Sequence, residues 1–137
     1  MNKLNGKIVA IESNSHLSLV DVAVDGEVFS ATLLETPQTA EYLKIGEEVT
    51  LLFKETEVSL AKNLTGMISL RNRFAVTVSS IERGDILSAV RLDYGSRQIT
   101  SVITTRSLEW FQLSIGDTVE ALVKANEIAL MKGHHDA

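Results

Sequence analysis

The chain has 137 residues, is 45% hydrophobic and carries a formal net charge of −5 at pH 7. It contains no cysteine, which excludes disulfides, thiolate metal sites and cysteine nucleophiles. No apolar stretch of membrane-spanning length and no leader-like opening occurs, so we expect a cytoplasmic protein that does not enter a membrane.

In chain order, alternating apolar residues predict five strands in the first half, over residues 8–11, 17–24, 28–34, 49–53 and 58–60. Asp25-Gly26 predicts a hairpin turn between the second and third of these strands. Thr36-Pro37 predicts the start of a short helix, with Thr36 as its N-cap and an end near Leu43.

A gapless repeat at an offset of seventy residues relates the two halves of the chain. Fifteen of the sixty-one positions over residues 2–62 are identical to the residue seventy positions later. The second half should repeat the elements of the first, with a turn at Gly95 and a helix over about residues 107–113. The sequence therefore predicts a mainly all-β chain of two tandem OB-like five-stranded barrels, each with one short helix. We place the first lobe at residues 1–66 and the second at residues 67–137.

Charge is distributed unevenly between the two halves. All six arginines lie in the second half, and residues 1–67 hold five Lys against ten acidic residues. Residues 68–137 hold eight basic against eight acidic residues. A small anion would therefore be expected to bind in the second half.

Candidate anion-binding residues occur at three places in the second half. These are Ser69, Leu70, Arg71 and Asn72 at its start, Thr104 and Ser107 at the start of the predicted helix, and Lys124 with Ala125 at the end of a strand. The first half has Leu34 and Pro37 where the second has Thr104 and Ser107. Cations, hydroxyls and the N–H groups of a helix N-terminus together suit an oxyanion. Alternatively, Thr104, Thr105 or Ser107 could cap the helix, and Arg71 and Lys124 could be solvated surface charges.

Catalytic constellations are not indicated by this sequence. It contains no Gly-x-Ser-x-Gly, no P-loop and no Gly-x-Gly-x-x-Gly. We interpret His134 and His135 as solvated residues of a polar tail, and Glu47-Glu48 as a solvated turn. We therefore expect a binding protein and not an enzyme.

Several spaced motifs resemble the molbindin (Mop) family, the molybdate-binding branch of the transport-associated OB-like domains. They are Ser69-x-Arg71-Asn72-x-Phe74, Ile81-Glu82-Arg83-Gly84, Ile103-Thr104 and the run from Leu113-x-Ile115-Gly116-Asp117 to Val123-Lys124-Ala125. The resemblance is clear in the second half and weak in the first, so the chain resembles a tandem di-Mop protein. It implies reversible binding of molybdate or tungstate for intracellular storage, buffering or homeostasis. An oxyanion-sensing regulatory or adaptor module, acting on a transcription or transporter partner, is the alternative.

The resemblance also implies roles for the candidate residues. Ser69, the Leu70 N–H and Arg71 would come from one lobe, and Thr104, Ser107, Lys124 and the Ala125 N–H from a neighbouring lobe. Asn72 would fix the turn without touching the anion.

Assembly of chains is a further expectation, because hydroxyls at the helix start occur only in the second half. A site between the second lobes of two chains would hold the full set of residues. We therefore expect a homo-oligomer, with a dimer favoured and a trimer as the alternative. An OB-type nucleic-acid binder is disfavoured by the net charge and by the small number of aromatic residues.

Overall fold

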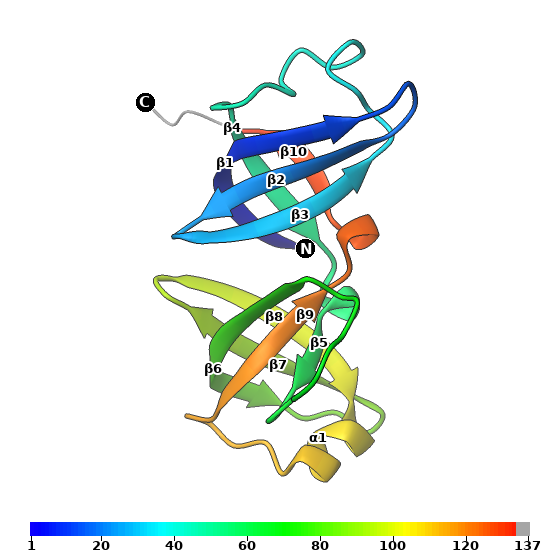
Figure 1. Cartoon of the computed structure of the whole chain (residues 1–137). Helices are drawn as coiled ribbons and strands as arrows, with labels where there is room; N and C mark the ends of the chain where they lie inside the picture. Colours follow the sequence, from blue (N-terminus) through cyan, green and yellow to red (C-terminus); the bar gives the residue numbers. More distant parts are fainter. Residues whose placement is uncertain (134–137) are drawn as a thin grey trace.

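The computed structural model describes residues 1–133, and it forms two β lobes placed one above the other (Figure 1). The strands are β1 (Asn2–Ser13), β2 (Ser18–Val24), β3 (Glu27–Leu33), β4 (Glu48–Phe53), β5 (Ser59–Ala61), β6 (Asn72–Glu82), β7 (Leu87–Tyr94), β8 (Arg97–Thr104), β9 (Thr118–Val123) and β10 (Ala129–Lys132). The helices are α1 (Thr105–Phe111) and the 3-10 turns η1 (Glu55–Glu57) and η2 (Ala125–Glu127). The predicted all-β fold with two five-stranded sheets is confirmed.

The last strand of each half pairs in the sheet of the other half. The strand orders are β10-β4-β1-β2-β3 and β5-β9-β6-β7-β8, so β5 joins the second sheet and β10 the first. Figure 1 shows β10 beside β4 in the upper lobe and β5 beside β9 in the lower lobe. The expectation that each half builds a barrel from its own five strands was therefore wrong for these two strands. Apolar alternation identifies a strand and its buried face, but it does not identify the strand's partner.

The sequence repeat is reproduced in the details of the backbone. The pairing of β1 with β2 shifts register between Ile8 and Ala10, and the pairing of β6 with β7 shifts between Val78 and Ser80. A bulge bends and twists a strand, which helps a short sheet to close on itself. The two lobes are therefore copies of one local geometry.

One continuous core joins the lobes. Phe29 of the first half and Phe74 of the second lie with ring centroids 4.9 Å apart, and Tyr94 lies 4.9 Å from Phe74. Aromatic rings in such tilted contacts contribute beyond their buried area. The lobes are thus held to each other by packing as well as by the exchanged strands.

Two asparagines related by the repeat connect the lobes through backbone hydrogen bonds. The amide of Asn2 donates to the Thr100 carbonyl and accepts from the Thr100 N–H, both at 2.8 Å. Asn72 makes the same pair of 2.8 Å bonds with Ser30. Both asparagines are buried, so each side chain satisfies backbone groups at the edge of the other lobe's sheet.

The first half has no helix at the predicted place. Residues 36–43 form successive turns, in which Thr39 and Ala40 both donate their N–H to the Thr36 carbonyl at 2.9 Å. The Thr39 hydroxyl also donates to the Thr36 carbonyl at 3.2 Å, so a side chain competes for the acceptor that a helix would use. In the second half, α1 begins at Thr105, two residues earlier than predicted, because Thr104 is its N-cap.

The missing helix leaves a buried hydroxyl without a partner. The Ser18 Oγ has no hydrogen bond to any residue of the described range 1–133, whereas the Oγ of Ser88, its repeat counterpart, bonds the Thr105 Oγ1 at 2.7 Å. The counterpart of Thr105 is Glu35, which explains the difference.

We expect Ser18→Ala to leave the free energy of unfolding unchanged or to raise it, and Ser88→Ala to lower it by about 1 kcal/mol. Urea denaturation of both variants measures this, and equal losses would contradict it.

Candidate functional site

A pocket between the lobes brings together six of the eight residues proposed from the sequence. It has a volume of about 540 Å³. The predicted residues that line it are Ser69, Leu70, Arg71, Asn72, Lys124 and Ala125. Residues fifty positions apart in the chain thus meet on one side of a single pocket.

Strand register explains why Arg71 and Lys124 lie together. In the antiparallel pair of β6 and β9, Asn72 is opposite Val123. Arg71 immediately precedes Asn72 and Lys124 immediately follows Val123, so both cations leave the sheet at the same end. Side chains at directly opposed positions of such a pair lie about 5 Å apart at their Cβ atoms. The sheet therefore concentrates two positive charges at the mouth of the pocket.

Neither of these two cations is neutralised within residues 1–133. The side chains of Arg71 and Lys124 are exposed and make no hydrogen bond or ion pair there. None of the described residues that line the pocket carries a carboxylate. Two unpaired cations in an acid-free pocket produce a local positive potential on a chain whose net charge is negative.

Arg73, two residues after Arg71 and within β6, has a different environment. Its Nε and one terminal nitrogen donate to the two carboxylate oxygens of Glu120, at 3.0 and 2.8 Å. These bonds hold the pKa of the Glu120 carboxyl below its usual value. Arg73 is therefore already committed to a carboxylate and offers a matched control for Arg71.

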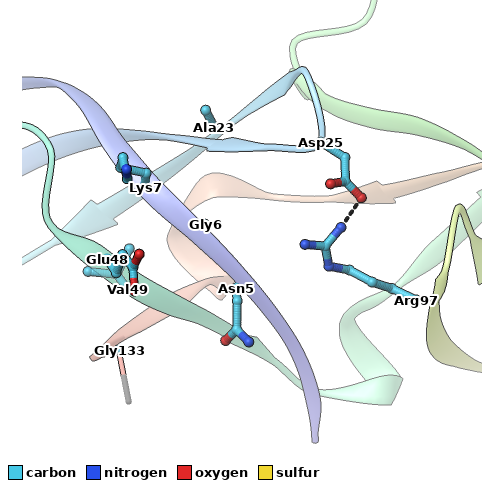
Figure 2. A pocket seen from close by; sticks show the side chains of 9 residues that line it. All are labelled: Asn5, Gly6, Lys7, Ala23, Asp25, Glu48, Val49, Arg97 and Gly133. Carbon is cyan, nitrogen blue, oxygen red and sulfur yellow. Dashed lines mark hydrogen bonds and ion pairs between the residues drawn. The ribbon is translucent and has the colours of Figure 1, made fainter. Parts of the chain in front are cut away.

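In a second pocket, unlike the pocket of Arg71, the cations are accompanied by carboxylates. A cavity of about 310 Å³, lined by the first sheet and by Arg97 of β8, contains Lys7 and Arg97, but Asp25 and Glu48 also line it. Figure 2 shows Arg97 pointing to the carboxylate of Asp25, with which it forms an ion pair. Mixed charges of this kind do not favour an anion over a cation.

Thr104 and Ser107 do not reach the pocket of Arg71 within one chain. The Thr104 hydroxyl accepts from the Ser107 N–H at 3.1 Å and donates to the Ser107 Oγ at 2.9 Å. Both residues line a separate pocket of about 450 Å³, with apolar neighbours such as Leu87 and Phe111 and no charged side chain. The capping role considered for them from the sequence is therefore present in the structure.

Asn72 has a different role from the one expected. Instead of fixing a local turn, its amide oxygen and nitrogen both bond the backbone of Ser30 on β3. Because β3 forms the opposite side of the pocket, Asn72 fixes the distance between the two sides.

Five residues that line the pocket were not proposed from the sequence. They are Leu19, Ser30 and Thr32 from the first half, and Ile68 and Asn126 from the second. The signal that could have identified Ser30 and Thr32 is their alternation with the buried Phe29, Ala31 and Leu33 along β3, which places two hydroxyls on its outward face.

Other kinds of site were sought in the part of the chain that the structure describes. Within residues 1–133, no group of three or more His, Cys, Asp or Glu side chains could hold a metal ion. None of the helices there is both long enough and apolar enough to cross a membrane. His134 and His135 lie outside the described residues.

Comparison with known proteins gives consistent results. Residues 68–130 match the TOBE domain family. The structure of the cytoplasmic molybdate-binding protein ModG, with molybdate bound, superposes with a TM-score of 0.89, at 26% identity and with 96% of each chain covered. The molybdenum transport protein ModE of Herbaspirillum seropedicae is 32% identical over 127 residues, which are 90% of this chain and 47% of that protein.

A second curated relative matches a shorter stretch. The molybdenum import ATP-binding protein ModC of Brucella abortus (strain 2308) is 43% identical over 84 residues, which are 61% of this chain and 23% of that protein. The chain thus spans less than half the length of these curated relatives.

Proposed function

Because the chain belongs to the molbindin-like family of TOBE-domain proteins, we propose that it binds molybdate or tungstate reversibly, without chemistry on the anion. The role would be storage, buffering or homeostasis in the cytoplasm. The observation that supports this most directly is the pocket that contains the unpaired Arg71 and Lys124 and no carboxylate.

The chemistry of this pocket matches a tetrahedral dianion. Two cations balance two negative charges, and hydrogen bonds from charged donors are about twice as strong as neutral ones. The Ser69 hydroxyl and the backbone N–H groups of Leu70 and Ala125 would supply further donors around the same anion. Arginine in particular offers a planar set of donors that can bind two oxygens at once.

Thr104 and Ser107 would enter this site only from a second chain, because within one chain they lie in another pocket. Exposed apolar side chains next to both sets of residues support such assembly. Leu34, which follows β3, is 86% exposed, and Leu87, opposite Thr104 in the sheet, is 54% exposed. We favour a homodimer with two equivalent sites, with a trimer as the alternative.

Isothermal titration calorimetry with molybdate, with sulfate as the control and the mass measured by light scattering, tests this function. We expect heat from molybdate, a much weaker response to sulfate, and about one anion per chain in a dimer. Absence of heat from both anions would refute the proposed function. A monomer that binds one molybdate tightly would refute the two-chain site only.

An oxyanion-sensing adaptor that acts on a transporter or transcription partner is the second candidate. The similarity of 84 residues to part of a molybdenum import ATP-binding protein favours it. A partner captured from lysate in the presence of molybdate, and lost in its absence, would support the adaptor over simple storage.

A further inference from the structure

Three uncharged side chains that line the pocket of Arg71 and Lys124 make no hydrogen bond with any other described residue. The Asn72 amide is occupied by Ser30, and the Ser30 hydroxyl donates to the Asp21 carboxylate at 2.7 Å. The remaining polar side chains of the pocket, Ser69, Thr32 and Asn126, make no hydrogen bond within residues 1–133. Of these three, only Thr32 comes from the first half of the chain.

We propose that Thr32 is an anion-binding residue, and that the first lobe supplies its hydroxyl to the site of the second lobe. This inference rests on the proposed function and extends it to a residue outside the family motif in the second half. It makes the first lobe part of the site.

The position of Thr32 is fixed by the elements around it. It lies on the outward face of β3, two residues from Ser30, which corresponds to about 7 Å along a strand. Ser30 is tied to Asn72 by two hydrogen bonds, and Asn72 is adjacent to Arg71 in the chain. The hydroxyl of Thr32 is therefore held at a set place relative to the cations, as ligand recognition requires.

The repeat provides an internal comparison. The counterpart of Thr32 is Val102, which lines both the pocket of Thr104 and a neighbouring pocket that contains Glu82 and Arg83. The hydroxyl thus occurs beside two unpaired cations, whereas the methyl group at position 102 occurs beside a cation that is already paired with Glu109. If the side chain only faced solvent, the presence of a hydroxyl would not need to coincide with the presence of unpaired cations. If the hydroxyl binds an anion, the two should coincide.

Thr32→Val removes the hydroxyl and keeps the branched shape that suits a strand. We expect roughly ten- to a hundredfold weaker molybdate binding, as for loss of one hydrogen bond to a charged group. Thr32→Ser, which keeps the hydroxyl, should bind within about threefold of the wild-type chain.

Thr77→Val is the matched control, because it removes an exposed hydroxyl, without a hydrogen bond within residues 1–133, from a strand position outside the pocket and should leave the affinity unchanged. Titration calorimetry of all three full-length variants, with circular dichroism to confirm the fold, decides the matter. Wild-type affinity in Thr32→Val would overturn the role of Thr32, and so would an equal loss in Thr32→Ser. Absence of molybdate binding by the wild-type chain would instead overturn the proposed function.

Discussion

Arg71→Ala is expected to weaken molybdate binding roughly ten- to a hundredfold while leaving the fold intact. Loss of one hydrogen bond from a charged donor costs about 1.5–3 kcal/mol, which corresponds to this range. The side chain is exposed and makes no hydrogen bond or ion pair within residues 1–133, so its removal breaks none in that part of the folded chain. Titration calorimetry measures the affinity, and thermal unfolding measures the stability.

Arg73→Ala is the control for this experiment. It removes the same charge only two residues along the chain, but that guanidinium is bound to Glu120. We therefore expect the affinity for molybdate to stay within a few-fold of the wild-type value. Equal losses in the two variants would mean that net charge, and not the pocket, determines binding. Wild-type affinity in Arg71→Ala would remove Arg71 from the site.

The stabilisation contributed by the Arg73–Glu120 pair is expected to depend on pH. Hydrogen bonds from Arg73 lower the pKa of Glu120 in the folded chain. The pair therefore contributes to stability above the pKa of an unfolded glutamate, and this contribution is lost as the pH falls through the lower folded value. Arg71 has no carboxylate partner of this kind in the described chain.

The part of the site that contains Arg71 and Lys124 could be predicted from the sequence because it depends on the pairing of two neighbouring strands. Arg71 and Lys124 come together through the register of two neighbouring antiparallel strands, and repeated apolar alternation is enough to identify those strands. Thr32 could not be predicted in the same way. Its place beside Arg71 depends on how the lobes pack, and nothing in its own strand indicates which side of the other lobe it faces.

The helix over residues 36–43 was predicted wrongly for a local reason. Thr36 and Pro37 have the residue types of a helix start, but Thr39 bonds back to Thr36 and closes a turn. The second half has Arg106 and Glu109 at those two positions, and there α1 forms. The first half also has Leu34 where α1 has its N-cap Thr104, and a short helix is marginal without such a cap because its nucleation is costly.

A chain shortened to end at Glu127 is expected to lose the first barrel. This removes β10, which pairs with β4 through four residues, and Ile128, which is 3% exposed. Loss of a buried Ile side chain alone costs about 2–5 kcal/mol, and the exposed edge of β4 adds to this. We expect rapid hydrogen exchange of the β4 amides, such as those of Val49 and Leu51, together with a lower midpoint of thermal unfolding.

The two halves expressed separately, as residues 1–66 and 67–137, extend this test to the boundary predicted from the repeat. Each half would lack the strand that completes its sheet, because β5 and β10 are exchanged. Neither should therefore be a stable monomer, whereas an equimolar mixture should form a one-to-one complex with the unfolding transition of the intact chain. Stable monomeric folding of either half would show that the exchanged strand is dispensable. In that case the lobes would be independent domains, and Thr32 could not be held against Arg71 by the fold alone.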